Sequence, residues 1–344
     1  MGIVLLGKSR DELQGVAESL GQPRFRGDQI AQWVYRRNAR TIMDMSNLPV
    51  SLRTALDETA EIGRSSVASK VDSEDGTIKL LLELRDGQRI ECVLLPYEDR
   101  VSVCISTQVG CPASCAFCAT GLGGFCRNLD AGEILDQVLT LQQFIERRIS
   151  HVVYMGMGEP LLNYANVLRS IELLTGEVGI SSRHITVSTV GIIPQILELA
   201  KLKLPITLAI SLHAVDDEQR KRLIPISARY RISDLVSACR EYVNTTRRKV
   251  TIEYMLLSGV NDRESDALRL ASLLKGMMVN VNLIPYNGVE GLDFRRPSNV
   301  RIKAFRSVLE RGGISVTQRL ERGHSIDAAC GQLRKRIGKN SKTA

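Results

Sequence analysis

Residues 101–118 read VSVCISTQVGCPASCAFC, an apolar segment followed directly by a loop that contains three cysteines. Cys111, Cys115 and Cys118 follow a C-x-x-x-C-x-x-C spacing. A short apolar segment rich in valine and isoleucine is typical of a buried strand. We therefore expect a strand that ends in a loop presenting three thiols.

Five further strand-like segments follow, and helical patterns separate them. Strands that alternate with helices indicate a parallel sheet with buried strands, and right-handed connections make such a sheet curl. We predict an α/β fold with a partial (β/α)6 barrel, in which ligands bind at the carboxyl ends of the strands. The expected strands are 101–107, 151–157, 185–190, 206–214, 250–257 and 279–286, and the expected helices are 131–148, 164–176, 194–202, 232–243 and 264–276.

The flanking regions have other patterns. Near the N-terminus, Ile30, Trp33 and Val34 share one helical face, and residues 77–96 indicate two strands around a turn at Asp86-Gly87. The predicted division is a helical accessory domain (1–62), a β-hairpin linker (63–100), the core (101–290), and a C-terminal helix, strand and tail (291–344).

Composition restricts the class of protein. A hydrophobic content of 44% in 344 residues supports a large core, and no apolar run approaches the roughly 18 residues of a membrane-spanning helix. The apolar N-terminal stretch is too short for a signal peptide, so we expect a cytoplasmic protein. A net charge of +8, with basic residues gathered in two places, favours a polyanion such as nucleic acid. The basic residues concerned are Arg24, Arg26, Arg36, Arg37 and the run Arg334–Lys335–Arg336.

Three clustered thiols in a reducing compartment suggest a metal centre. Zinc prefers four ligands; Cys104 or Cys126 could supply a fourth, but the spacing is a poor match to a zinc ribbon. Three thiolates on a cluster of four irons leave one iron open to chelate the amino and carboxylate groups of an amino acid. The spacing favours the iron–sulfur cluster, with a zinc-containing, non-catalytic RNA-binding protein as the alternative from another class.

A second motif follows the second expected strand. Gly156 and Gly158 allow a ligand to approach the backbone closely, and Glu159, before Pro160, offers a carboxylate for an ammonium group. Alone, the motif is weak evidence for a ligand site, but its position after the cysteine loop makes the evidence stronger.

Together these motifs resemble those of the RlmN and Cfr family of radical S-adenosylmethionine (SAM) RNA methyltransferases. The resemblance extends from about Trp33 to Leu333 and rests on the cysteine loop and on GMGEPLLNY (156–164), ISLHA (210–214), VNLIPYN (281–287) and IDAACGQLR (326–334). It implies methylation at C2 of adenosine 2503 in 23S rRNA and of adenosine 37 in some tRNAs. Methylation of the same 23S rRNA adenosine at C8, as Cfr performs, is the alternative within the family.

The resemblance also implies catalytic roles. Cys330 matches the cysteine that is methylated by one SAM; a radical made from a second SAM then activates this methyl group, and a transient covalent adduct with the RNA forms. Cys104 matches the thiol that resolves the adduct through a transient disulfide with Cys330. Glu91 matches the proton acceptor.

The implied cofactors are one [4Fe-4S] cluster held by Cys111, Cys115 and Cys118, and two SAM per turnover. The implied partners are 23S rRNA before complete ribosome assembly, tRNA, and a low-potential reductant such as flavodoxin or ferredoxin; no membrane is expected, and the chain is expected to be a monomer. Cys126 is an additional thiol without a family role. The implied SAM contacts are Gly158, Glu159, Ser188, Ser211, Leu212, His213 and Asn287.

Overall fold

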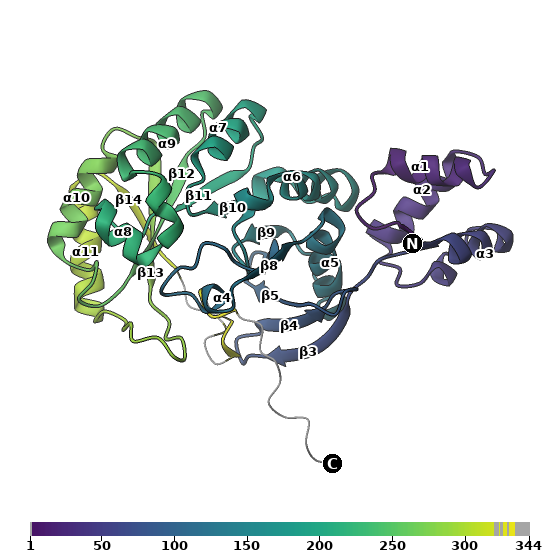
Figure 1. Cartoon of the computed structure of the whole chain (residues 1–344), viewed down its shortest axis with the longest axis horizontal. Helices are drawn as coiled ribbons and strands as arrows, with labels where there is room; N and C mark the ends of the chain where they lie inside the picture. The colour runs from purple at the N-terminus through teal and green to yellow at the C-terminus, as the bar shows by residue number, and fades with distance from the viewer. Residues whose placement is uncertain (1, 320–322, 324–325, 329, 334–344) are drawn as a thin grey trace, which may run out of the picture.

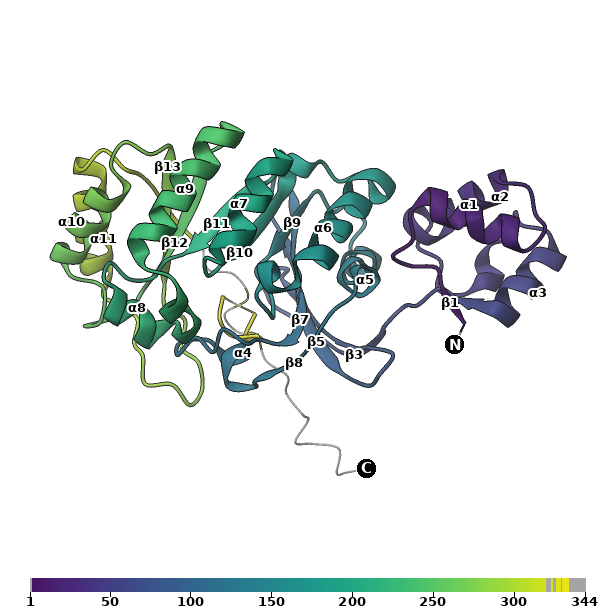
Figure 2. The ribbon, with the colours of Figure 1, turned by 45° about the horizontal axis from the view of Figure 1, so that its top comes forward.

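The computed structural model describes residues 2–319, 323, 326–328 and 330–333. Its main feature is a ten-stranded sheet, with a helical unit at one end of the molecule (Figures 1 and 2). Seven neighbouring strands are parallel and follow chain order across the sheet. They are β6 (Val101–Cys104), β9 (His151–Tyr154), β10 (Ile185–Thr189), β11 (Thr207–Ser211), β12 (Val250–Leu256), β13 (Val279–Pro285) and β14 (Ser315–Gln318).

Helices connect these strands and lie on the outer side of the sheet (Figure 2). Each buries an apolar stripe; in α5, for example, Ile134, Leu135 and Val138 are buried. The longer helices are α5 (Ala131–Leu141), α6 (Tyr164–Leu173), α7 (Ile193–Leu202), α9 (Ile232–Thr246), α10 (Glu264–Leu274) and α11 (Asn299–Arg311). Short turns are η3 (Gln142–Phe144), η4 (Pro160–Asn163), η5 (Leu174–Val178), η6 (Ser182–His184) and η7 (Pro225–Arg229).

One contact demonstrates the curl of the sheet. Arg319, directly after β14, donates from Nη1 to the Sδ atom of Met155, directly after β9, at 3.3 Å. Four strands separate β14 from β9 in the sheet. The carboxyl ends of the strands therefore surround a common interior, although the sheet does not close. The predicted partial α/β barrel is confirmed, with β14 as a seventh parallel strand.

The predicted hairpin is present as β4 (Ile78–Glu83) and β5 (Arg89–Pro96), and Gly87 in its turn has φ +77°. A third strand, β3 (Ser66–Asp72), pairs with β4. Its residues are mostly exposed, so no alternation of apolar and polar residues revealed it. Because β5 pairs with β6, the hairpin continues the main sheet.

The helical unit contains α1 (Arg10–Ser19), α2 (Phe25–Ala31), η1 (Gln32–Arg36), η2 (Ile42–Asp44) and α3 (Val50–Thr59). The predicted face is confirmed, since Ile30 and Val34 are buried and Trp33 is half-buried. Two short strands, β1 (Ile3–Val4) and β2 (Ala60–Glu61), pair in parallel and bring the two ends of the unit together. Strands of two residues are too short to leave a pattern. Within the described part of the chain, no helix is long and apolar enough to cross a membrane.

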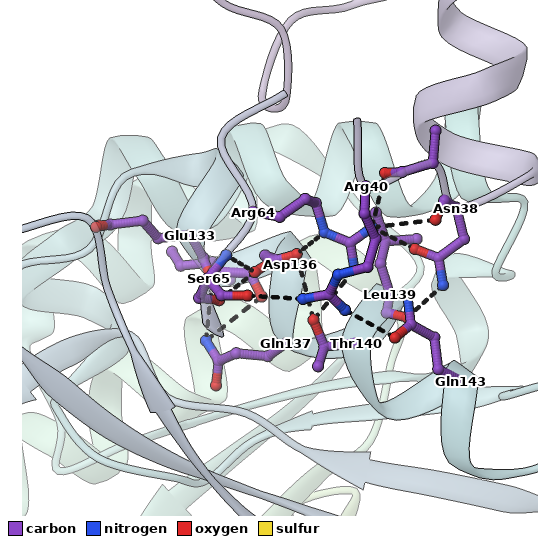
Figure 3. A network of polar contacts seen from close by, with 12 residues as sticks. Asn38, Arg40, Arg64, Ser65, Glu133, Asp136, Gln137, Leu139, Thr140 and Gln143 are labelled. Atoms are coloured by element: carbon purple, nitrogen blue, oxygen red, sulfur yellow. Dashed lines mark hydrogen bonds and ion pairs between the residues drawn. The ribbon is translucent and has the colours of Figure 1, made fainter. Parts of the chain in front are cut away.

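A buried ion pair joins the helical unit to α5 (Figure 3). Arg64 pairs with Asp136, and their side chains are only 4% and 1% exposed. Asp136 also accepts from the backbone N–H of Ser65 at 2.8 Å, and Arg64 donates to the Asn38 side chain and to Thr140 Oγ1. Since each charge is both paired and hydrogen-bonded, this network fixes the point where the chain leaves the unit.

Replacing Asp136 with alanine should release this attachment. The variant leaves the Arg64 guanidinium buried without its counter-charge, which costs about 3 kcal/mol. We expect a lower urea midpoint and earlier proteolytic release of residues 1–62. Asp99→Ala is the control, because the Asp99 side chain is 72% exposed and its pair with Arg100 contributes little. Equal stability of the two variants would contradict the assignment.

Candidate active site

The cysteine loop is enclosed by a small hairpin that the sequence did not predict. β7 (Gln108–Gly110) pairs with β8 (Phe125–Asn128), and α4 (Ala119–Leu122) begins directly after Cys118. Gly110 has φ +78°, and a Cβ atom there would lie 1.9 Å from the carbonyl oxygen of Gly124. Only glycine therefore allows the two sides of the loop to approach this closely.

A second support comes from α8 (Asp217–Leu223), which the sequence analysis also missed. The N–H of Ala116 donates to the carbonyl of Leu223 at 2.9 Å. The ring of Phe117 meets the imidazole of His213 edge-on, with centroids 5.0 Å apart. His213 Nδ1 accepts from the N–H of Met255 at 3.0 Å, and burial lowers the pKa of His213 to about 3. The imidazole is therefore neutral, with its proton on Nε2.

Two cavities meet at the carboxyl ends of the strands. The first, here called the cluster cavity, has about 800 Å³ of empty space, which includes its opening to solvent. It gathers the three loop cysteines and five of the predicted SAM contacts from separate strand ends. Its lining includes Cys111, Cys115, Cys118, Gly158, Glu159, Ser188, Ser211, His213, Glu253, Arg319 and Cys330.

Close backbone and side-chain contacts fix the positions of Gly158 and Glu159. Gly158 has φ +105°, and a Cβ atom would lie 2.7 Å from the Gln108 side chain. The Glu159 carboxylate accepts from the N–H groups of Leu161 at 2.9 Å and Val190 at 2.8 Å. Burial raises the pKa of Glu159 to about 7. The carboxylate is thus oriented by the backbone and poorly solvated, which favours binding of a cation.

The other predicted SAM contacts are placed in three different ways. The hydroxyl groups of Ser188 and Ser211 lie 3.4 Å apart at neighbouring strand ends. Leu212 is buried outside the lining, and its N–H donates to the carbonyl of Glu253. Asn287 lines the second cavity, where its buried Oδ1 has no hydrogen-bond partner among the described residues.

The second cavity, here called the thiol cavity, lies beside the first. Cys118 and Cys330 line both cavities, whereas Cys104 lines the thiol cavity alone. Cys330 is held there because Gly331 accepts from the N–H of Ala119 at 2.7 Å. The thiol cavity is lined by Leu95, Tyr97, Cys104, Cys118, Thr120, Met155, Gly156, Ile284, Pro285, Asn287, Arg319, Ala328, Cys330, Gly331 and Leu333.

Two buried charged groups were missed in the sequence: Arg319 lies near both thiols, and Glu253 lies near Cys330. Burial raises the pKa of Cys330, whereas the positive charge of Arg319 opposes this shift. Burial raises the pKa of Cys104 to about 12, with a further contribution from Cys330. Glu253 is buried and accepts from Asn282 Nδ2 at 2.8 Å. Glu253 interrupts an apolar strand and Arg319 follows the last strand, so both carried a signal that was overlooked.

Glu91 lies on β5, outside the lining of both cavities. Its side chain is buried, and its Oε1 lies 3.5 Å from Lys79 Nζ. Lys79 Nζ also donates to the carbonyl of Asp327 at 3.2 Å, three residues before Cys330. The hairpin therefore does contact the segment that contains Cys330, and Glu91 lies at that contact.

The predicted RNA-binding arginines lie on the helical unit. The Arg37 guanidinium lies 4.5 Å from the centroid of the Trp33 ring, and Arg26 lies 4.7 Å from that of Phe25. Arg24 forms exposed ion pairs with Asp11 and Glu18, and Arg36 donates to the carbonyl of Val178. Arg36 thus binds the core, and the run Arg334–Lys335–Arg336 lies outside the described residues.

The remaining cysteines lie elsewhere. Cys126 is exposed, and Cys92 and Cys239 are buried, as expected for core thiols. Among the described residues, no group of three or more Cys, His, Asp or Glu side chains could hold a single metal ion. The donor set fits an iron–sulfur cluster with a bound amino acid, because three thiols, an oriented carboxylate and an unpaired amide oxygen face adjoining cavities.

Comparisons with known proteins agree with this site. The family model described as "Radical SAM superfamily" matches residues 105–271. The family model described as "Ribosomal RNA large subunit methyltransferase N-terminal domain" matches residues 3–62. A protein of Thermosynechococcus vestitus named "Probable dual-specificity RNA methyltransferase RlmN" is 50% identical over 96% of this chain and 98% of its own length. A protein of Gloeobacter violaceus with the same name is 48% identical, over 96% and 95%.

A solved structure covers nearly the whole fold. The crystal structure of a radical SAM methyltransferase from Sphaerobacter thermophilus matches with a TM-score of 0.94 and 43% identity, over 96% of this chain and 99% of that one. Members of the radical SAM superfamily use a [4Fe-4S] cluster and SAM. These matches, over the cysteine loop, the barrel and the helical unit, show that this chain belongs to the RlmN family of radical SAM RNA methyltransferases.

Proposed function

We propose that this enzyme methylates C2 of adenosine 2503 in 23S rRNA, before ribosome assembly is complete, and of adenosine 37 in some tRNAs, with Cys330 as the methyl carrier. The observation that carries the proposal is the position of Cys330, which lines both the cluster cavity and the thiol cavity. One sulfur atom can therefore face the cofactor on one side and the resolving thiol Cys104 on the other.

The cluster cavity has the groups that both cofactors need. Cys111, Cys115 and Cys118 would hold the cluster, and Glu159 would hold the ammonium group of SAM, with Gly158, Ser188, Ser211, Leu212, His213 and Asn287 around the rest of it. When bound, the cluster and SAM supply methyl groups and a carbon-centred radical. We propose two SAM per turnover and a low-potential reductant such as flavodoxin or ferredoxin, in a monomeric cytoplasmic enzyme.

The protein supplies the sulfur chemistry. Burial alone would keep Cys330 protonated, so the charge of Arg319 assists loss of the thiol proton before the sulfur takes a methyl group. After the methyl-derived carbon radical has joined adenine C2, Glu91 would accept the C2 proton, and the one remaining unpaired electron would return to the cluster. Cys104 then loses its thiol proton, which the charge of Arg319 assists, and attacks the sulfur of Cys330. The S–S bond forms, the S–C bond breaks, and its electron pair stays on the carbon, which takes up a proton to complete the methyl group.

The helical unit is suited to hold the RNA. Arg26 and Arg37 combine positive charge with neighbouring aromatic rings, which suits phosphates and unstacked bases. An adenine within folded RNA must leave its stack to reach a buried sulfur atom.

Replacing Cys330 with alanine should abolish RNA methylation while cluster assembly persists, because the variant removes only the methyl carrier. Methyl transfer from labelled SAM to protein and to RNA is measured by mass spectrometry, which also separates 2-methyladenosine from the 8-methyladenosine of the C8 alternative. Cys126→Ala is the matched control, since this exposed thiol lines neither cavity. Methylated RNA from Cys330→Ala would refute the carrier role.

Replacing Cys104 with alanine should trap protein covalently joined to RNA, because no thiol is left to attack Cys330. The adduct is detected as a band that disappears after ribonuclease treatment. Cys239→Ala, which alters a buried thiol of α9, should turn over normally. Multiple turnovers by Cys104→Ala would count against the resolving role.

Replacing Glu159 with glutamine should weaken SAM binding by about tenfold or more, the contribution of a hydrogen bond to a charged group. Equilibrium dialysis of the cluster-loaded protein measures the dissociation constant. Glu172→Gln on α6 is the control, because its side chain is 67% exposed. An unchanged affinity would exclude Glu159 as the ammonium ligand.

A further inference from the structure

Arg220 on α8 is the largest fully buried side chain of the described structure, with 1% exposure. Its Nε donates to the carbonyl of Leu212 at 3.2 Å, and its Nη2 donates to the carbonyls of Val190 and Ser211. Val190 directly follows β10, Ser211 is the last residue of β11, and Leu212 directly follows it. The guanidinium is therefore fixed at the edge of the sheet that bears the cluster cavity.

Among the described residues, the Asp217 carboxylate attracts the charge of Arg220 but forms no ion pair with it. No ion pair involves it among the described residues, and its Nη1 is buried there without a hydrogen-bond partner. Asp217, on the same helix, accepts instead from the N–H of Ile232 at 2.7 Å. A buried cation with an unpaired N–H is costly unless an anion completes its surroundings.

One anionic group that the family implies at this edge of the sheet is the cluster. α8 contacts the cysteine loop directly, since Leu223, one turn after Arg220, accepts from the N–H of Ala116. Val190 and Ser211, whose carbonyls accept from the guanidinium, line the cluster cavity together with Cys115, whereas Arg220 itself does not line it.

We propose that Arg220 is the built-in counter-charge of the iron–sulfur cluster and that it raises the cluster's reduction potential. Reduction adds one electron, and hence one negative charge, to a centre already surrounded by three thiolates. A fixed positive charge in a poorly solvated interior stabilises the reduced state more than the oxidised one. Arg220 would act on the reaction only through the cluster, without touching the substrate. The inference rests on the proposed function, which requires that cluster.

The test compares reduction potentials of anaerobically reconstituted protein. Arg220→Gln and Arg220→Met remove the charge, Arg220→Lys keeps it, and Arg222→Gln removes an exposed charge from the same helix as a matched control. At a fixed potential, the ratio of reduced to oxidised cluster, measured by electron paramagnetic resonance, should fall about tenfold in the neutral variants, equivalent to about 59 mV for one electron. Arg220→Lys and Arg222→Gln should stay close to the wild type.

Each other outcome has a defined meaning. Unchanged potentials in Arg220→Gln overturn the inference, and so does weaker SAM binding at an unchanged potential, which would assign Nη1 to the cofactor carboxylate. If the neutral variants fail to take up iron, retention by Arg220→Lys supports a requirement for charge, whereas failure of Arg220→Lys as well reduces Arg220 to a structural role. A wild-type protein without iron would instead refute the proposed function itself.

Discussion

The site depends on the attachment of the C-terminal segment to the helix that follows the cysteine loop. The N–H of Ala119 donates to Gly331, and the hydroxyl of Thr120 donates to the carbonyl of Leu333 at 2.6 Å. Residues more than 200 positions apart in the chain are thereby held together. Without these bonds, Cys330 would have no fixed position relative to Cys118, and the two cavities would not share a wall.

Charged side chains are buried around this attachment, in positions where charged ligands can bind to them. Arg319 reaches across the interior of the sheet to Met155, Glu253 lies near it, and Glu159 is oriented by two backbone N–H groups. Isolated buried charges are unfavourable, so their presence indicates a site built for charged ligands and reactive sulfur. Such a site lowers the free energy of unfolding of the unliganded protein in exchange for reactivity.

The rest of the molecule gives this interior a fixed frame. The hairpin strands β4 and β5 extend the sheet beside β6, and Lys79 on β4 contacts the segment that leads to Cys330. At the other side, the Arg64–Asp136 pair fastens the helical unit to α5. The arginines of that unit are therefore held at a set position relative to the active site, which suits an enzyme that methylates RNA.

The sequence by itself determined the elements with strong periodicity. Six strands, their helices and the hairpin were predictable because apolar side chains repeat at the intervals that strands and helices require. Elements that bury few side chains were not predicted, because they leave no periodic pattern of apolar residues. These are the exposed strand β3, the two-residue strands β1 and β2, and the seven-residue helix α8. The cysteine loop and the strand-end residues were also readable, since spacing fixes which residues share a loop or a strand end.

Only the tertiary structure decided which of these residues meet. Cys104, Cys118 and Cys330 lie in three separate segments, and no local pattern states that they line one cavity. The burial of Arg220 was not readable in the sequence, because an arginine is ordinarily exposed, and the position of Arg319 after the last strand did not reveal its burial either. Their significance comes from burial, and burial results from the curl of the whole sheet and from the packing of α8 against the loop, which depend on every strand in between.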